Sequence, residues 1–195
     1  MPYVRIFGPP ALMLAAFVLV PGPVAAQTPA QQERIAQCKT CHGADGNSTT
    51  DNMPSLAGQP EFFILNQLVL LREGVRKVEP MVPFVKDLKD EDIQALAAYF
   101  SALPATAAGA APDPARVEQG ARLAAMKRCD SCHGPALAGD RQIPRIARQR
   151  IDYMRDSLKA YRDNTRTGAD TAMSAMIFGL TDADLEALAH YAASR

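Results

Sequence analysis

The sequence predicts an all-α fold in which one small helical domain occurs twice in tandem. Two observations lead to this prediction. Apolar residues recur at the three- and four-residue spacing of helices, and no stretch shows the convincing alternation of a strand. In addition, the second half of the chain repeats the first at a shift of about 91 residues, with the order of the matching residues kept throughout.

The repeat is clearest in two short motifs. CKTCHG at 38–43 recurs 91 residues later as CDSCHG at 129–134, and PSLAGQ at 54–59 recurs 90 residues later as PRIARQ at 144–149. Further matches follow in the same order, and the shift drifts by only one residue in either direction. Chance explains such a pattern poorly, whereas a duplicated domain explains it directly.

Composition marks the domain boundaries. Residues 1–26 have the pattern of an export signal, with one basic residue, an apolar run and small residues before a cut at Gln27. An uncleaved membrane anchor is the alternative, although the apolar run is short for a bilayer. A linker at 104–114, rich in proline and alanine, separates an N-terminal domain at 27–103 from a C-terminal domain at 115–195.

Each half is expected to contain three main helices, of which the first leads into a cysteine motif. In the N-terminal half we expect them at 31–38, 61–73 and 90–102. In the C-terminal half we expect them at 114–128, 151–162 and 181–193. Pro114 suits the first turn of a helix, and Thr181 with Asp184 three residues later resembles a capping box.

All four cysteines and two of the three histidines fall in two copies of the pattern Cys-x-x-Cys-His, at 38–42 and 129–133. This pattern is the attachment signature of a c-type haem. Two thiols on one short helical turn reach the two vinyl groups at one edge of the porphyrin, and the adjacent histidine binds the iron. The sequence therefore predicts two haem c groups. The residues expected to attach them are Cys38, Cys41, Cys129 and Cys132, with His42 and His133 as proximal iron ligands.

Three other uses of paired cysteines fit less well. A redox dithiol of the thioredoxin type would accompany a β-α-β pattern. A zinc site would bring its two cysteine pairs within about 20 residues of each other, whereas 87 residues lie between Cys41 and Cys129. Disulfides are common in exported proteins, but they would not explain the histidine that follows each pair.

Two irons need two distal ligands, and His190 is the only histidine left. His190 has no counterpart in the first half, so we expect it to be a packing residue of the last helix. Methionine sulfur is the next choice. Met81 and Met173 occupy equivalent places, each seven residues before the leucine that opens the last helix. We therefore expect Met81 and Met173 to bind iron, with Met176 as the alternative at the second haem.

Taken together, these motifs resemble those of the dihaem cytochrome c4 family. The resemblance rests on the twin Cys-x-x-Cys-His-Gly motifs, the segment 54–59, a methionine before the last helix and DEDIQALAAYF at 90–100, and it covers essentially the whole mature chain. It implies two cytochrome c folds whose haems face each other across the domain interface. The family's haem-binding and iron-ligating residues correspond to Cys38, Cys41, Cys129, Cys132, His42, Met81, His133 and Met173.

The resemblance also implies electron transfer in the bacterial periplasm, often toward a terminal oxidase. The expected partners are a quinol-oxidising complex or dehydrogenase upstream and a terminal oxidase or reductase downstream. Similar two-domain chains also serve as bound cytochrome subunits of periplasmic dehydrogenases of the flavocytochrome type, which is the alternative role. An iron with six ligands has no free position for a substrate, so we expect an electron-transfer protein and no enzyme.

The second copy departs from the family pattern near its haem motif. Arg148 stands where the first copy has Gly58, and the segment before Met173 is two residues longer than its counterpart before Met81. These differences concern the surroundings of the second haem rather than its attachment.

Charge narrows the set of partners. The chain carries 21 basic and 21 acidic residues, which argues against a nucleic-acid partner. Membrane association is expected only if residues 1–26 are retained. Residues 27–103 carry a net charge of −3 and residues 104–195 a net charge of +2. The segment 141–150 holds four arginines and no acid. It is either a docking patch for an acidic partner or a solvated face with one arginine paired to a haem propionate.

Overall fold

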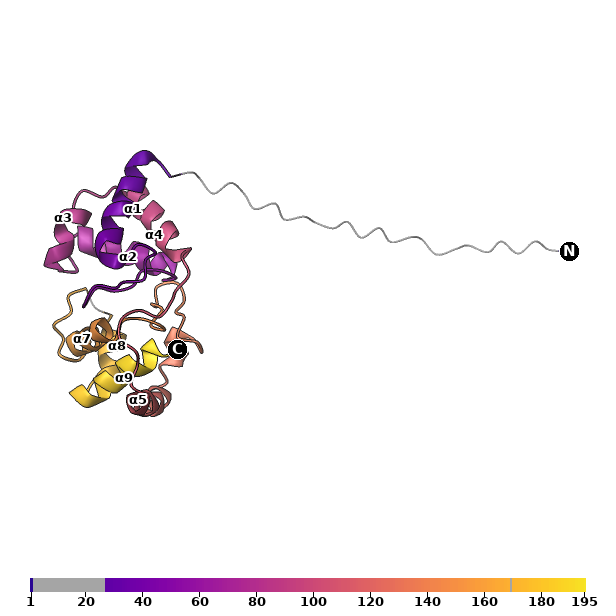
Figure 1. The fold of residues 1–195 in the computed structure, drawn as a ribbon, viewed down its shortest axis with the longest axis vertical. Coiled ribbons are helices and arrows are strands. Elements are labelled where there is room, and N and C mark those ends of the chain that lie inside the picture. Colours follow the sequence, from indigo (N-terminus) through magenta and orange to yellow (C-terminus); the bar gives the residue numbers. More distant parts are fainter. Residues whose placement is uncertain (2–26, 169) are drawn as a thin grey trace.

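The computed structural model describes Met1, residues 27–168 and residues 170–195 (Figure 1). The expected export signal, apart from Met1, lies outside the described residues. Helices dominate the described part, which contains no strand and a single isolated β-bridge between Asp140 and Ile143. The prediction of an all-α fold is therefore confirmed. None of the described helices is both long and apolar enough to cross a membrane.

The helices form two lobes in chain order, one above the other in Figure 1. The N-terminal lobe contains α1 (Pro29–His42), α2 (Glu61–Arg72), the 3-10 helix η1 (Glu79–Met81), α3 (Val82–Val85) and α4 (Asp90–Ser101). The C-terminal lobe contains α5 (Pro114–Met126), α6 (Asp130–His133), α7 (Ile151–Arg162), α8 (Thr171–Ile177) and α9 (Asp182–Ala193). The six longest helices are those that the sequence predicts, whereas η1, α3, α6 and α8 are additional.

Side chains at the helix starts explain where two of these helices begin. Thr28 and Gln31 form a capping box at α1, in which Thr28 Oγ1 accepts from the Gln31 N–H at 3.2 Å and Gln31 Oε1 accepts from the Thr28 N–H at 2.9 Å. Thr181 and Asp184 exchange the same pair of bonds at α9. Pro114 occupies the first turn of α5, where it lacks no hydrogen bond that the helix would make.

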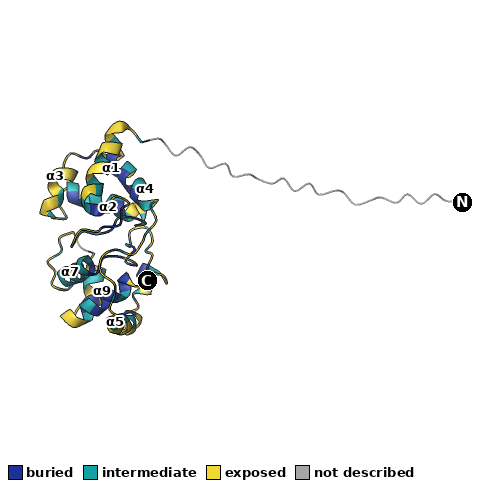
Figure 2. Ribbon diagram, viewed as in Figure 1, coloured by how far each residue is buried: buried dark blue, intermediate teal, exposed yellow. Residues whose placement is uncertain are grey.

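Each lobe buries its own apolar core, visible as the dark blue inner faces in Figure 2. The N-terminal core contains Ile93, Leu96 and Phe100 of α4, all of them at most 3% exposed. Its counterpart is built around Leu185 and Ala189 of α9, both fully buried. The last helix of each lobe thus presents its apolar stripe to the core, as its sequence pattern predicts.

Helices α5 and α9 pack closely against each other where Gly120 of α5, which has no side chain, faces α9. A Cβ atom at Gly120 would overlap the carbonyl oxygen of Ala187 and the Cβ of Tyr191. Only glycine therefore permits this close approach of the two helices.

We expect Gly120→Ala to lower the free energy of unfolding by about 3 kcal/mol, because the new methyl group must push α5 away from α9. Urea denaturation of the haem-loaded protein measures this change. Glu118→Ala on the same helix is the matched control, since it removes only an exposed ion pair with Arg122 and should change stability by less than about 1 kcal/mol. Equal stability of Gly120→Ala and the parent protein would contradict the packing described here.

Candidate functional site

A cavity of about 820 Å³ runs between the two lobes, and both Cys-x-x-Cys-His motifs line it. Its lining is mostly apolar. The residues that the sequence singles out and that line this cavity are Cys38, Cys41, His42, Met81, Cys129, Cys132, His133 and Met173. The fold therefore brings all eight predicted site residues, from both halves of the chain, to the walls of one continuous space.

The carbonyl group of a proline holds each motif histidine in place. His42 Nδ1 lies 2.8 Å from the carbonyl oxygen of Pro54, and His133 Nδ1 lies 2.9 Å from that of Pro144. Because a carbonyl oxygen only accepts, Nδ1 carries the proton and donates it. Nε2 is then the free lone-pair nitrogen, which is the form of imidazole that binds a metal.

His42 Nε2 is buried and has no hydrogen-bond partner within the described residues. Burial lowers the pKa of His42 and of His133, although each bond to a prolyl carbonyl acts in the opposite direction. Both rings are therefore neutral at pH 7. A buried nitrogen without a partner is costly in a folded protein. A haem iron would satisfy this atom, so the histidine fits the cofactor that the motif implies.

None of the four motif cysteines is paired in a disulfide. Burial raises the pKa of Cys38 to about 11, and it also raises the pKa of Cys129, where the nearby Asp130 adds to the effect. A reactive dithiol needs a lowered pKa, so this environment argues against a disulfide oxidoreductase. Within the described ranges, no three His, Cys, Asp or Glu side chains gather as a metal-ion site. The zinc alternative therefore has no supporting cluster.

The methionines differ in how they face the cavity. Met81 at the end of η1 and Met173 in α8 are half-buried and pack against the cores of their lobes. Met176 also lines the cavity, but it is 43% exposed. Met53 and Met154 line the cavity as well, and Met154 is buried within the C-terminal core. Met81 and Met173 are alike in being half-buried and in packing against the core of their own lobe.

His190 has a different role from the two motif histidines. Its Nδ1 accepts a hydrogen bond from the main-chain N–H of Asp113 at 2.9 Å, and its Nε2 lies 3.3 Å from Glu186 Oε1. It is buried in α9, and it is absent from the described lining of the cavity. His190 ties the start of α5 to α9, in line with the packing role expected from the sequence.

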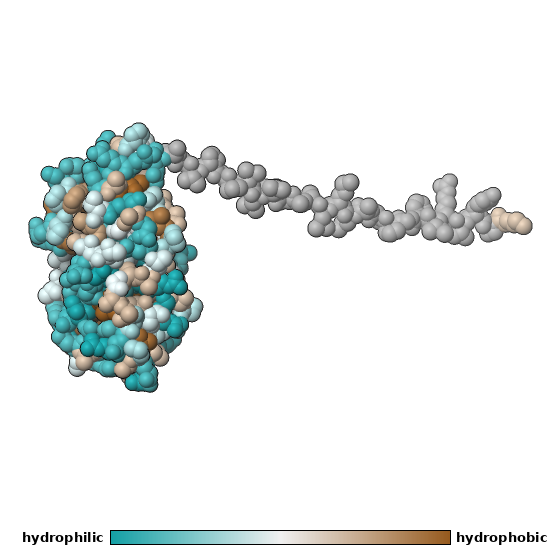
Figure 3. Space-filling view, in the orientation of Figure 1, coloured by the Kyte–Doolittle hydropathy of each residue, from teal (hydrophilic) through white to brown (hydrophobic). Residues whose placement is uncertain are grey.

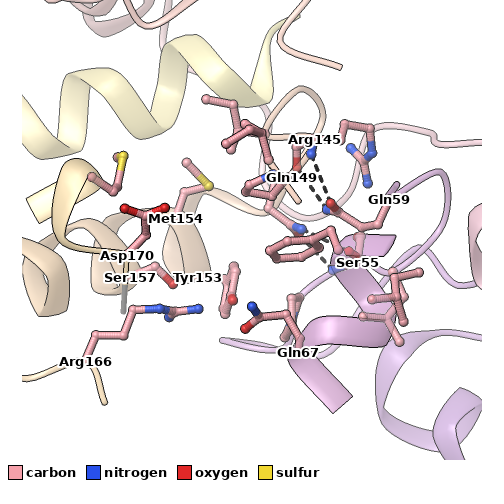
Figure 4. A pocket seen from close by; sticks show the side chains of 18 of the residues that line it. Ser55, Gln59, Gln67, Arg145, Gln149, Tyr153, Met154, Ser157, Arg166 and Asp170 are labelled. Carbon is pink, nitrogen blue, oxygen red and sulfur yellow. Dashed lines mark hydrogen bonds between the residues drawn. The ribbon is translucent and has the colours of Figure 1, made fainter. Parts of the chain in front are cut away.

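Two glutamines at equivalent repeat positions join the lobes reciprocally (Figure 4). Gln149 Oε1 accepts from the Ser55 N–H at 2.8 Å, and Gln149 Nε2 donates to the Ser55 carbonyl oxygen at 2.9 Å. Gln59 makes the same two bonds with the main chain of Arg145, at 3.0 and 2.9 Å. Ser55 and Arg145 are themselves repeat equivalents, so the interface has a local two-fold symmetry.

Sequence reasoning missed this bridge. Gln59 and Gln149 are identical in the two copies, even though the residues just before them, Gly58 and Arg148, differ. That identity was the available signal, but it shows only that the position is special and not that its partner lies in the other half.

The arginines of 141–150 do not form the docking patch that their sequence suggested. Arg145 and Arg150 are buried, at 6% and 5% exposure, and only Arg141 and Arg148 are exposed. The two buried side chains bind groups of the N-terminal lobe across the interface. Neither a docking patch of four exposed arginines nor a face with all four solvated is therefore formed, because folding directs half of this charge inward.

Arg150 lies within an ion-pair cluster that spans the interface. Its Nη2 is 2.7 Å from Asp51 of the N-terminal lobe and 2.7 Å from Asp152 at the start of α7. Asp152 Oδ2 also accepts a hydrogen bond from the main-chain N–H of Asn52 at 3.0 Å. The charged groups of this cluster thus fasten the start of α7 to the opposite lobe.

Comparison with known proteins agrees with this geometry. The family model described as cytochrome c matches residues 117–194, and the one described as cytochrome c oxidase, cbb3-type, subunit III matches residues 25–100. Cytochrome c4 from Pseudomonas aeruginosa is 34% identical over 173 residues, which cover 83% of this chain and 85% of that protein. A thiosulfate dehydrogenase electron acceptor from Thiomonas intermedia is 31% identical, over 95% of this chain and 88% of its own.

A solved structure extends the likeness to three dimensions. The crystal structure of reduced recombinant cytochrome c4 from Pseudomonas stutzeri matches with a TM-score of 0.77 at 32% identity, covering 87% of this chain and 99% of that chain. Fold, cysteine motifs and family models together define a c-type cytochrome, which carries covalently bound haem c and transfers electrons rather than catalysing a reaction. The chain belongs to the cytochrome c4 family of dihaem cytochromes.

We expect Gln149→Ala to lower the free energy of unfolding by about 2 to 4 kcal/mol, because it leaves two main-chain groups of Ser55 unpaired in a buried interface. Gln59→Ala should have a similar effect, because it leaves the main-chain N–H and carbonyl group of Arg145 unpaired.

The double variant should unfold in two steps rather than one, because the lobes are then less firmly coupled. Denaturation followed at the haem absorbance measures both effects, with the exposed Gln94→Ala of α4 as a control. A single transition of unchanged midpoint would contradict the bridging role.

The carboxylate of Asp152 makes the stability of the interface depend on pH. Burial alone would raise the pKa of Asp152, but bonds from the Arg150 side chain and from the main-chain N–H groups of Asn52 and Tyr153 bring it down to about 2. An unfolded aspartate titrates near pH 3.9. The stabilisation is therefore fully present well above about pH 4 and is lost as the pH falls toward 2.

Asp152→Asn should consequently be less stable than the parent protein at pH 6, and the difference should shrink steadily as the pH is lowered to 2. Urea midpoints at a series of pH values test this expectation. A difference that stays constant over this range would show that the carboxylate contributes nothing through its ionisation.

Proposed function

We propose that this protein is a periplasmic electron carrier that holds two haem c groups, one in each lobe, with a histidine and a methionine on each iron. The N-terminal haem is assigned to Cys38, Cys41, His42 and Met81, and the C-terminal haem to Cys129, Cys132, His133 and Met173. The proposed organisation is an export signal at 1–26, an N-terminal domain at 27–103, a linker at 104–114 and a C-terminal domain at 115–195.

The observation that carries this proposal is the shared cavity with both Cys-x-x-Cys-His motifs on its walls. Each motif histidine is oriented by a prolyl carbonyl, and His42 Nε2 is left without a partner among the described groups. When bound, a haem supplies an iron that cycles between its ferric and ferrous states and so takes up or releases one electron. The mostly apolar lining would limit the access of water to a bound haem and so favour the less charged, ferrous state of its iron.

A methionine as the distal ligand of each iron would suit a protein that transfers electrons and binds no substrate at the iron. A methionine sulfur favours ferrous iron and raises the reduction potential. It also fills the sixth position, so that oxygen or a substrate has no place to bind. The half-buried positions of Met81 and Met173, each packed against a core, would keep these ligands in place in both oxidation states.

Each lobe offers an apolar contact where the cavity reaches the surface. Phe84 of α3 is 44% exposed and Met176 of α8 is 43% exposed, and both line the cavity at equivalent repeat positions. Figure 3 shows small apolar patches within a hydrophilic surface on both lobes. Short-lived redox complexes bury small areas of this kind. An electron would enter through one lobe and leave through the other.

The proposed partners are proteins. A quinol-oxidising complex or a dehydrogenase would supply electrons, and a terminal oxidase or reductase would accept them. The balanced charge of the chain offers no basic surface for nucleic acid. The export-signal pattern at 1–26 supports the periplasm as the compartment, and a membrane-tethered form would follow only if this segment is retained.

A fixed subunit of a dehydrogenase complex is the second candidate function. The relative from Thiomonas intermedia is named as an electron acceptor of thiosulfate dehydrogenase, and it matches over 95% of this chain. Purification from the native source separates the two roles. A free carrier would elute alone, whereas a subunit would elute with a catalytic chain in fixed proportion.

The optical spectrum of the purified holoprotein tests the assignment. We expect the ferric protein to show the near-infrared sulfur-to-iron band at the intensity of two methionine-ligated haems, and the ferrous protein to remain unchanged under carbon monoxide. Binding of carbon monoxide at one haem would show an open iron and would overturn the proposal for that lobe.

Two variants decide between the candidate ligands in α8. Met173→Leu should remove half of the near-infrared band and allow carbon monoxide to bind one haem, because leucine keeps the bulk of the side chain and loses the sulfur. Met176→Leu is the matched control and should keep the full band. The opposite result would assign Met176 to the second iron.

A further inference from the structure

Arg145 stands apart among the charged side chains of the interface. It is 6% exposed, and its Nη2 donates to the carbonyl oxygen of Ala57 in the other lobe at 2.8 Å. Its Nη1 donates to the carbonyl oxygen of Ala147. Its Nε has no hydrogen-bond partner in the part of the chain that the structure describes. Among the described buried side chains, only His42 Nε2 and Arg145 Nε are left without a partner.

The charge of Arg145 is also unbalanced. No described carboxylate lies within ion-pair distance of its guanidinium, whereas the neighbouring Arg150 contacts both Asp51 and Asp152. Burial lowers the pKa of Arg145 to about 10, and the charge of Arg148 adds to this effect. A buried cation without a counter-charge is strongly unfavourable. The fold therefore retains a positive charge that the described residues do not neutralise.

The position of Arg145 indicates what neutralises it. The residue lines the cavity. The side-chain amide of Gln59 in the opposite lobe bonds both the main-chain N–H and the carbonyl oxygen of Arg145 (Figure 4). It directly follows Pro144, whose carbonyl orients His133. The anion must therefore belong to the occupant of the cavity itself. A haem carries two propionate carboxylates, and an arginine forms strong charge-assisted hydrogen bonds with a carboxylate.

We propose that Arg145 binds a haem propionate at the lobe interface and that its charge raises the reduction potential of that haem. This inference rests on the proposed function, because it requires haem in the cavity. The equivalent position of the N-terminal lobe is Ser55, whose Oγ accepts from the Ser48 N–H. The arginine therefore breaks the two-fold symmetry of the interface and makes the two haem environments electrostatically unequal.

The expected direction follows from charge. Oxidation adds one positive charge to the haem, and a nearby buried cation opposes that change. Arg145→Gln removes the cation while keeping a hydrogen-bonding side chain. We therefore expect this variant to lower the reduction potential of at least one haem. At a fixed electrode potential its ferric-to-ferrous ratio should rise about tenfold, which corresponds to a decrease of about 59 mV for a one-electron couple.

Spectroelectrochemical titration of the holoprotein measures both haems in one experiment. Arg148→Gln is the matched control, because it removes the same charge from an exposed side chain of the same loop, which donates a hydrogen bond to the Ala105 carbonyl oxygen. We expect this control to shift either ratio by less than about twofold, since exposed charges are screened by solvent. Equal shifts in the two variants, or no shift in Arg145→Gln, would overturn the inference.

Resonance Raman spectroscopy reports the propionate directly through its bending mode. Arg145→Lys retains the charge but loses the guanidinium fork, so it should move this mode and leave the potentials close to those of the parent protein. An unmoved propionate mode in Arg145→Lys would contradict the contact, even if Arg145→Gln does not fold. Failure of the proposed function would look different, since the parent protein itself would then lack two methionine-ligated haems.

Discussion

The amide side chains of Gln59 and Gln149 cross the lobe interface in opposite directions and bind main-chain groups of the other lobe. Both segments that they join lie immediately after the prolines that orient the motif histidines. The bridge therefore helps to fix the position of one motif histidine relative to the other. Because each of the two amides satisfies one donor and one acceptor, neither lobe can slide along the other without breaking four buried hydrogen bonds.

The buried arginines of the interface do not share the two-fold symmetry of the glutamine bonds. Arg150 is balanced by two carboxylates, one from each lobe, and so acts as a fastening. Arg145 is equally buried but has no described carboxylate beside it. The same short segment thus contributes one cation to the stability of the interface and a second one that faces the cofactor cavity. Arg148, two positions before Arg150, is exposed and takes no part in either role.

Local patterns in the sequence predicted much of this architecture. The helical period located the six long helices, and α7 begins and ends at the predicted residues. The short helices η1 and α8 escaped prediction because three to seven residues are too few to show a period. The glutamine bridge joins residues about 90 positions apart, which no local pattern reveals. The arginine segment was misjudged for the same reason, since a run of charge does not indicate which side chains point inward.

The two-fold symmetry of the interface has a consequence for how such a chain arises and behaves. A single-lobe protein with the 54–59 surface would carry a self-complementary patch, because the same glutamine and main-chain groups appear on both sides of the contact. Such lobes would pair as a dimer whose occupancy depends on concentration. Joining two lobes by the short segment between α4 and α5 makes the encounter intramolecular, at a local concentration in the millimolar range. In a fused chain the two contact surfaces no longer have to be identical in sequence. Ser55 in the first lobe and Arg145 at the equivalent position of the second are an example of such a difference.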